Sequence, residues 1–279
     1  MGIAVTEPGS AGLGAVVTGL DLESPAPGEC EALRRAFRAS PMLCLRSGKA
    51  TPDSFLRLAR IFGTPQRELM GVLRDNAYPE ISLIERRRGI STATGKAATF
   101  GGHWHTDDSY MEVPCAATLL YGEVVPPEGG DTSFANMRLA YEALADETKA
   151  RIAGLKAVHT YQSRRNRSPV PARTPEEEAL TPPVTHPLVR THPETGRKAI
   201  YINPNRIDRI ADLALDEGDA LLDALIAHAT QPAFVHVHAW QPDDIVVWDN
   251  RCTMHRASPH EGDHPRRLLR ILIEGRVPE

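Results

Sequence analysis

The chain has 279 residues, of which 41% are hydrophobic and 24% are charged, the composition of an ordinary globular protein. Its 32 Lys and Arg against 36 Asp and Glu give a formal net charge of −4, which argues against a nucleic-acid partner. No apolar run approaches the roughly 18 residues of a membrane span, and the first residues show no secretory signal pattern. We therefore expect no membrane partner. Scattered cysteines without a CxxC pair indicate a reduced, cytoplasmic enzyme: Cys30, Cys44, Cys115 and Cys252.

The N-terminal half is predicted to combine short strands with two helices. The second helix has the clearest signals, since Thr51 can cap it, Pro52 suits its first turn and Gly63 suits its exit. Its apolar residues at i, i+3, i+4 and i+7 predict one buried stripe. The other predicted elements are a helix at 28–40 and strands at 14–22, 42–46, 80–85 and 116–125.

The C-terminal half is predicted to be richer in strands. A helix is expected from about Arg138 to Leu155, with Asn136 as its cap. The segment 163–187 is rich in Pro and charge and shows no periodicity, so we expect a structureless loop that acts as a lid or is a disordered insert. The remaining elements are two strands within 188–203, a helix near 214–229, and strands at 234–240, 244–250 and 266–275.

This order of elements predicts a mainly β fold with flanking helices. Short strands separated by turns favour an antiparallel barrel or a double-sheet jelly roll with helices outside. The chain shows no internal repeat and no linker, so residues 1–279 are expected to form a single domain. A jelly-roll core would offer an open mouth where a metal and a small ligand can bind.

Two His-x-Asp/Glu patterns could supply part of a metal site. Two His and one carboxylate on one face of a metal are typical of non-haem Fe(II) oxygenases, and residues two apart on a strand point the same way. His105 and Asp107 precede an apolar strand, which favours them. His192 and Glu194 lie in "THPETGRK", where Pro, Gly and charge predict an exposed turn, so this pair is interpreted as solvated.

The third ligand is expected far along the chain, at the end of a buried strand. In "DIVVWDNRCTMHRA", the Asp249-Asn250 turn would bring His255 back towards the mouth of the core. His236 and His238 are alternatives, although they are as easily cross-strand surface residues.

Two arginines on the last strand suggest anion binding. Arg266 and Arg270 are four residues apart, share a face and would lie roughly 13 Å apart. A buried guanidinium needs a carboxylate partner, which its planar fork can bind bidentately. One arginine could hold a dicarboxylic cosubstrate and the other an acidic substrate. The alternative is a pair of surface arginines on an edge strand.

With these motifs, the sequence resembles the Fe(II)- and 2-oxoglutarate-dependent dioxygenases that include taurine dioxygenase and the 2,4-dichlorophenoxyacetate dioxygenases. The likeness covers nearly the whole chain, and "HPLVRTHPETGRK" is closest to the aryloxyalkanoate dioxygenases. His-x-Asp followed 150 residues later by His, with an Arg eleven residues further on, is specific in this context. The segments that carry the resemblance are "WHTDDSY" (104–110), "PPEGGDTSF" (126–134), "VVWDNRCTMHRA" (246–257) and "RRLLR" (266–270).

The resemblance implies a double-stranded β-helix, or cupin-like jelly-roll, core and a dimer or tetramer. The implied reaction uses O2 and 2-oxoglutarate to hydroxylate, or to cleave after hydroxylation, a small to medium organic acid, with release of succinate and CO2. The implied roles are Fe(II) binding by His105, Asp107 and His255, 2-oxoglutarate binding by Thr132 and Arg266, and substrate-anion binding by Arg270.

The pocket around the first histidine also departs from the family pattern. Taurine dioxygenase has an Asn four residues before its first metal His, where this sequence has Gly101, so taurine is not expected as the substrate. His103 and Tyr110 are expected at the substrate pocket, and Trp104 and Trp248 are either pocket or core residues. Two other functions stay open: a metal-dependent hydrolase or isomerase, and a non-catalytic ligand-binding barrel.

Overall fold

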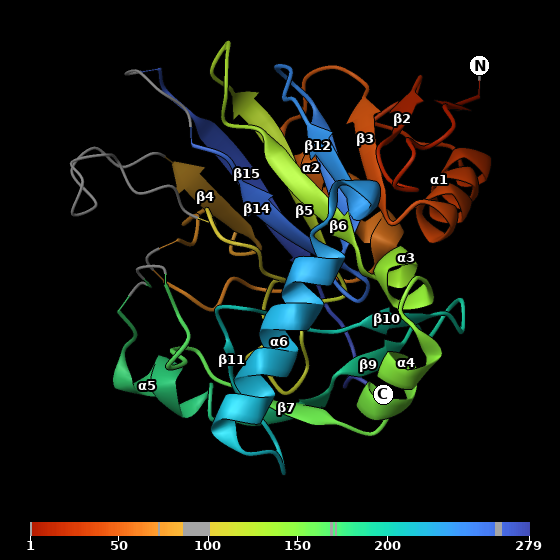
Figure 1. Ribbon diagram of the computed structural model, residues 1–279. Helices are drawn as coiled ribbons and strands as arrows, with labels where there is room; N and C mark the ends of the chain where they lie inside the picture. The colour runs from red at the N-terminus through yellow and green to blue at the C-terminus, as the bar shows by residue number, and fades with distance from the viewer. Residues whose placement is uncertain (1, 72, 86–100, 168–169, 171, 260–263) are drawn as a thin grey trace.

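One large sheet is the main structural element of the fold (Figure 1). The computed structural model describes residues 2–71, 73–85, 101–167, 170, 172–259 and 264–279. Among the described strand pairs of this sheet, only β2 and β3 run parallel. The seven strands lie in the order β1 (Ala4–Val5), β2 (Ala15–Thr18), β3 (Met42–Arg46), β13 (Ile245–Asp249), β5 (Ala117–Val124), β15 (Arg267–Ile273) and β4 (Ile81–Glu85).

A second sheet of three strands packs against the large one. Its order is β12 (Val235–His238), β6 (Thr132–Asn136) and β14 (Thr253–Ala257), all antiparallel. Phe134 from the centre of this sheet packs against Trp248 of the large sheet, with ring centroids 5.3 Å apart. The predicted mainly β fold is confirmed, in the form of a double-sheet jelly roll.

Alternation along the strands gives the large sheet two apolar faces. On β3, Leu43 and Leu45 pack towards the helices α1 (Pro27–Ala39) and α2 (Pro52–Phe62), whereas Met42 and Cys44 face the second sheet. On β15, Ile271 belongs to the helix side and Leu268 to the space between the sheets. Because successive side chains of a strand point to opposite faces, the residues of β15 at even distances from Leu268 also point into the space between the two sheets.

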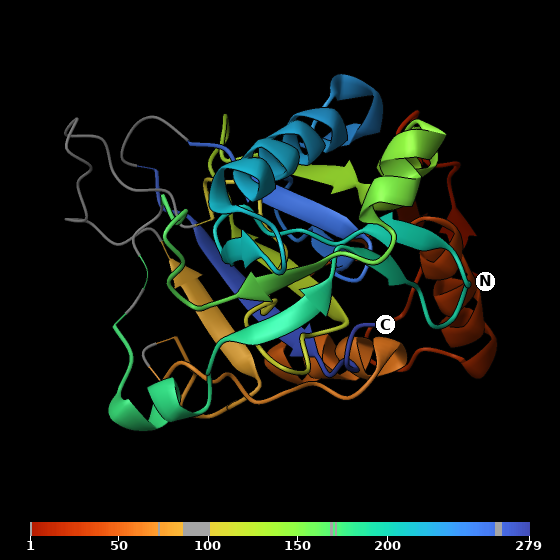
Figure 2. The ribbon, with the colours of Figure 1, turned by 60° about the horizontal axis from the view of Figure 1, so that its bottom comes forward.

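Helix α6 (Leu215–Ala229) packs beside β11 (Ile207–Ile210) and shares a buried core with the second sheet (Figures 1 and 2). Helix α6 contributes buried leucines to a core that also contains Ala135 of β6 and Met254 of β14. None of the described helices is long and apolar enough to cross a membrane. The further elements here are α3 (Met137–Glu142), α4 (Asp146–Ile152), β7 (Lys156–His159), β8 (Val184–Pro187), β9 (Val189–Thr191), β10 (Lys198–Ile200) and the short 3-10 helix at Pro232–Phe234.

The structure differs from the sequence prediction at three places. The helix expected at 138–155 is two helices, α3 and α4, because the chain leaves the helical conformation before Asp146 and Ala145 is extended. Strand β6 was not predicted, although its residues are all buried. Segment 163–187 is not structureless, since it contains α5 (Pro175–Ala179) and β8, and Thr174 caps α5 by accepting a hydrogen bond from Glu177.

Candidate active site

The two halves of the predicted metal motif meet beside β14, at a pocket lined by residues of both sheets. His255 lies on β14, and the His105 segment lies beside it in an isolated antiparallel bridge. The amide of His105 donates to the carbonyl of His255 at 3.0 Å, and the amide of His255 donates back at 2.7 Å. Their ring centroids are 4.1 Å apart. Backbone pairing therefore fixes the spacing of the two imidazoles.

Asp107 completes a cluster of donor atoms with these imidazoles. Oδ1 of Asp107 lies 3.9 Å from Nε2 of His105, and Oδ2 of Asp107 lies 3.9 Å from Nε2 of His255. One ligand atom from each residue lies within 4.8 Å of the others. Burial lowers the pKa of His105, and it lowers the pKa of His255 to about 3, so both rings are neutral at neutral pH and keep a lone pair. Two neutral imidazoles and a carboxylate are a donor set suited to a divalent metal.

Hydrogen bonds outside this cluster orient two of its members. Nδ1 of His105 lies 2.7 Å from the carbonyl of His103 and must carry its proton there, which leaves Nε2 as the free donor atom. Oδ2 of Asp107 accepts a hydrogen bond from Oγ1 of Thr118 at 2.7 Å. Burial acts to raise the pKa of Asp107, but His255, Arg270 and His105 outweigh it, so the pKa lies below its usual range.

Asn250 connects the metal motif to the large sheet. Its amide nitrogen donates to Thr118 at 2.7 Å, and its amide oxygen accepts from the indole of Trp248 at 3.0 Å and from the amide of Asp107 at 3.3 Å. The backbone carbonyl of Asn250 accepts a hydrogen bond from the hydroxyl of Thr106 at 2.9 Å. The turn after β13 thus sets both the position of His-x-Asp and the hydroxyl that holds its carboxylate.

The pocket beside this cluster holds a half-buried cation, Arg266, that forms no ion pair with any carboxylate of the described residues. The guanidinium of Arg266 donates to the carbonyl of Gly130 at 3.3 Å, and its Nε has no hydrogen-bond partner among the described residues. Burial lowers the pKa of Arg266 to about 10, the expected result for a desolvated charge. The pocket is lined by Ile84, Gly101, His105, Asp107, Leu120, Thr132, Trp248, His255, Ala257, Arg266, Leu268 and Arg270.

Thr132 stands in the same pocket as this arginine. Its hydroxyl oxygen accepts a hydrogen bond from the indole of Trp240 at 3.0 Å, which leaves the hydroxyl proton for another acceptor. A hydroxyl donor and an unpaired guanidinium in one buried pocket suit a carboxylate.

Arg270, which was expected to bind the substrate anion, has a carboxylate partner in the structure. Its Nη2 lies 2.7 Å from Oε2 of Glu68, and the two side chains are only 11% and 4% exposed. Its Nη1 lies 4.0 Å from Asp107. Burial acts to raise the pKa of Glu68, but Arg270 and a hydrogen bond from Ser82 outweigh it, so the pKa of Glu68 is lowered. The ion pair is therefore charged on both sides.

The remaining predicted pocket residues take different positions. Gly101 lines the pocket with φ +73°, and a Cβ there would lie 3.2 Å from the His105 ring. Trp248 also lines the pocket. The side chain of His103 is exposed, and its carbonyl rather than its ring contacts the cluster. Tyr110 is buried, and its hydroxyl donates to a carboxylate oxygen of Asp108 at 3.3 Å.

Trp104 lies against the α6 side of the fold. It packs at the edge of the core under α6, and the guanidinium of Arg256 lies 4.8 Å from its ring centroid. Trp104 is not among the residues that line the pocket. Of the two tryptophans, Trp248 is thus the pocket residue.

The second His-x-Glu pattern is not the exposed pair that was expected. His192 is 2% exposed, and its Nε2 lies 2.9 Å from Oδ2 of Asp249. The guanidinium of Arg251 holds the same carboxylate at 2.7 Å and also pairs with the exposed Glu194. The prediction was wrong for His192 because the turn folds back onto the end of β13. Its cluster with Asp249 and Cys252 already contains a resident cation, Arg251.

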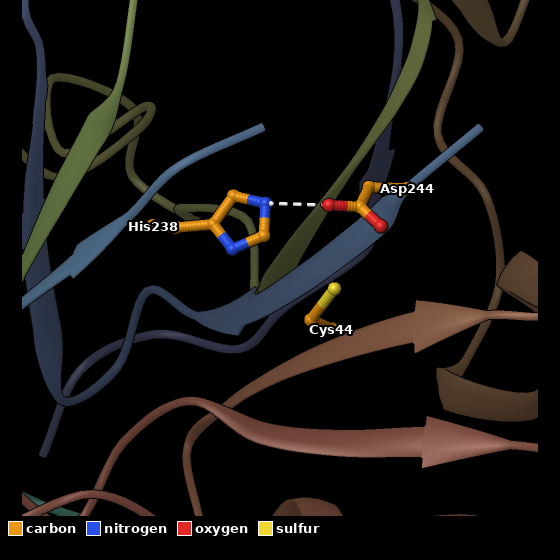
Figure 3. Close-up of side chains that lie close together, drawn as sticks. All are labelled: Cys44, His238 and Asp244. Carbon is orange, nitrogen blue, oxygen red and sulfur yellow. Dashed lines mark ion pairs between the residues drawn. The ribbon is translucent and has the colours of Figure 1, made fainter. Parts of the chain in front are cut away.

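The alternative ligand His238 is also buried rather than on the surface. Figure 3 shows it facing Asp244, 3.2 Å away, with Cys44 beside them. Arg46 donates to the same carboxylate at 3.0 Å. Of the three buried groups of potential ligands in the described part of the chain, only the His105 cluster has a carboxylate without a hydrogen-bonded guanidinium. His255, rather than His238, is thus the histidine that lies beside His105 and Asp107.

Sequence reasoning missed three residues of the site: Glu68, Thr118 and Asn250. Thr118 had a recognisable signal, a hydroxyl within the apolar run "AATLLYG". Asn250 was read only as part of a turn. Glu68 carried no signal, because the proximity of "QRELM" to the last strand depends on tertiary structure.

Comparison with known proteins places the chain in one enzyme family. The family described as "Taurine catabolism dioxygenase TauD, TfdA family" matches residues 6–272. An alpha-ketoglutarate-dependent 2,4-dichlorophenoxyacetate dioxygenase from Burkholderia sp. (strain RASC) is 31% identical, over 90% of this chain and 87% of its own. A (S)-phenoxypropionate/alpha-ketoglutarate-dioxygenase from Sphingobium herbicidovorans is 33% identical, over 96% and 94%.

Solved structures give the same result. AAD-2 in complex with Mn(II) and N-oxalylglycine has a TM-score of 0.82 at 35% identity, covering 100% of this chain and 99% of that one. A taurine dioxygenase from Burkholderia xenovorans has a TM-score of 0.84 at 30% identity, covering 100% and 91%. Fold and relatives define a 2-oxoglutarate-dependent dioxygenase, which acts with a metal. The chain belongs to the TauD/TfdA family of these enzymes.

Proposed function

We propose that this dioxygenase uses Fe(II), held by His105, Asp107 and His255. The observation that carries the proposal is that three neutral or anionic donor atoms lie within 4.8 Å of one another beside a pocket with an unpaired arginine. Two His and one carboxylate with open positions suit non-haem Fe(II). With 2-oxoglutarate and O2, such a metal supplies the oxidant that removes hydrogen from a substrate carbon.

In the same proposal, Arg266 and Thr132 bind the distal carboxylate of 2-oxoglutarate. The guanidinium is desolvated and its Nε has no hydrogen-bond partner within the described part of the chain, so a carboxylate would satisfy it and restore its pKa. Thr132 can donate its hydroxyl proton to the same carboxylate. Neither a metal hydrolase nor a non-catalytic barrel would need this pair, and the relatives support neither alternative.

The substrate is proposed to be a small to medium organic acid, by analogy with the relatives that act on 2,4-dichlorophenoxyacetate and phenoxypropionate. Hydroxylation next to the ether oxygen of such an acid would give an unstable product that cleaves. The chain's part is to position that carbon and to exclude water. Gly101 leaves room for the substrate beside the His105 ring.

Segment 163–187 is proposed to close over the substrate as a lid. Glu177 of α5 accepts a hydrogen bond from Gly71 at 3.1 Å, next to the segment that carries Glu68. Lids of this kind exclude water when substrate binds. Limited proteolysis should cut this segment more slowly once Mn(II), N-oxalylglycine and an aryloxyacid are bound, and an unchanged cutting rate would contradict the lid.

We also propose one domain over 1–279, a cytoplasmic location and a dimer or tetramer. Strands β1 and β15 from the two ends of the chain share one sheet, which supports a single domain. Free cysteines support a reducing compartment. Membership of the family supports the oligomer. Size-exclusion chromatography with light scattering should give the mass of a dimer or a tetramer, and the mass of a monomer would contradict this proposal.

Metal binding tests the ligand assignment directly. His105→Ala and His255→Ala should each lose at least 100-fold in Mn(II) affinity, measured by equilibrium dialysis. His103→Ala is the matched control, since the carbonyl rather than the side chain of His103 orients the ligand. Full affinity in either ligand variant would show that the metal is bound elsewhere.

A further inference from the structure

Arg270 lies between two carboxylates, those of Glu68 and of the proposed metal ligand Asp107. Its Nη2 is 2.7 Å from Oε2 of Glu68, whereas its Nη1 is 4.0 Å from Oδ1 of Asp107, beyond hydrogen-bond distance. A shift of the guanidinium by about 1 Å would bring Nη1 within hydrogen-bond distance of that oxygen. The structure therefore keeps a strong hydrogen-bond donor close to a ligand atom without direct contact.

The carboxylate of Glu68 is itself fixed by further hydrogen bonds. Its Oε1 accepts from the amide of Met70 at 3.0 Å, and its Oε2 accepts from the hydroxyl of Ser82. Ser82 on β4 lies directly opposite Arg270 on β15 in the large sheet. The side chain of Arg74 donates to the backbone carbonyl of Glu68 at 2.9 Å. Glu68 is thus anchored well enough to hold the Arg270 guanidinium in place.

Glu68 also balances the charge that Arg270 would otherwise present to the metal site. The guanidinium contributes +1 and the carboxylate −1, so the buried pair sums to zero. Without Glu68, a buried cation would lie beside the carboxylate that has to bind a divalent metal. It would repel the metal, and it would compete for Asp107 by forming an ion pair with it. Both effects would weaken metal binding.

The ion pair leaves part of Arg270 available to a substrate anion. Glu68 contacts Nη2, whereas the buried Nε of Arg270 has no hydrogen-bond partner among the described residues. Arg270 also lines the pocket beside the ligand cluster. Its expected role in binding the substrate anion is therefore compatible with its pairing to Glu68.

We propose that Glu68 is a positioning residue, which holds the guanidinium of Arg270 away from Asp107 and so keeps the Asp107 carboxylate free for the metal. This inference rests on the proposed function, because Asp107 is a ligand in that proposal. It predicts that the loss of Glu68 harms metal binding only while Arg270 is present. A role of Glu68 in folding alone would not depend on Arg270 in this way.

Mn(II) affinity, measured by equilibrium dialysis in two backgrounds, tests this dependence. In the wild-type chain, Glu68→Gln should weaken Mn(II) binding at least about 10-fold. In the Arg270→Gln chain, the same substitution should change the affinity less than about 3-fold, because no guanidinium then competes for Asp107 and a buried Glu68 without its cation is largely protonated. Ser82→Ala, which loosens Glu68 but keeps its charge, should give a smaller loss that also disappears in the Arg270→Gln chain. This variant decides the question if Glu68→Gln does not fold.

Asp244→Asn is the matched control. Asp244 is also a buried carboxylate that pairs with an arginine, Arg46, but neither residue lines the pocket, so Mn(II) affinity should stay within about 3-fold of wild type. Normal affinity in Glu68→Gln, or an equal loss in both backgrounds, would overturn the inference. Failure of the wild-type protein to bind Mn(II), or normal binding by His255→Ala, would instead overturn the proposed function.

Discussion

Replacing Thr118 with Val should weaken metal binding without removing any ligand. The substitution preserves shape, but it deletes the hydroxyl that donates to Oδ2 of Asp107 at 2.7 Å. A hydrogen bond to a charged group contributes about 1.5–3 kcal/mol, and about 1.4 kcal/mol corresponds to a tenfold change in affinity. Loss of orientation at Asp107 should therefore lower Mn(II) affinity about 10- to 100-fold, the usual effect of removing an outer-shell partner.

The same substitution also leaves Asn250 short of one acceptor. Its amide nitrogen bonds Thr118 at 2.7 Å and retains only the Cys115 sulfur at 3.2 Å, so a stability loss of about 1–3 kcal/mol is expected. Equilibrium dialysis gives the affinity, and urea unfolding gives the stability. Thr118→Ser keeps the hydroxyl and should bind Mn(II) within about 3-fold of wild type. Wild-type affinity in Thr118→Val would refute the claim that this hydroxyl orients the ligand.

Three further changes test other parts of the account. Arg266→Gln should raise the apparent KM for 2-oxoglutarate at least 10-fold with a smaller effect on metal binding, because it removes the unpaired guanidinium; an unchanged KM would contradict that role. Asp249→Asn should lower the free energy of unfolding by about 3–5 kcal/mol in urea titrations, since it removes the buried carboxylate that Arg251 and His192 share and leaves Arg251 only the exposed Glu194; a loss below about 1 kcal/mol would contradict this. Gly101→Ala should weaken Mn(II) binding several-fold through strain at φ +73° and contact with His105, and normal affinity would show that the backbone adapts.

The sequence predicted those parts of the fold whose signals are local. Helix α2 has the predicted cap at Thr51, and strands such as β13 have boundaries close to those expected from their apolar runs. The helix capped by Asn136 was predicted correctly at its start but not in its length, because nothing local marks the turn that separates α3 from α4. Strand β6 was missed because three of its five residues, in "TSFAN", are polar and become buried only in the tertiary structure.

At the site, spacing predicted which residues meet but not what else they touch. His105, Asp107 and His255 come together because motif spacing reflects strand pairing. The neutralisation of Arg270 by Glu68 could not be predicted, since the two residues are 202 positions apart and no local pattern relates them. Sequence patterns thus predicted which three donor residues meet, whereas the charge of the pocket depends on contacts between distant segments.

The most direct test of the central claim is succinate release from 2-oxoglutarate by the purified protein with Fe(II), ascorbate and O2, with and without phenoxyacetate. The account predicts slow succinate release alone, faster release with the acid, and no release from His255→Ala. Equal turnover by wild type and His255→Ala, or turnover that persists without O2, would contradict it.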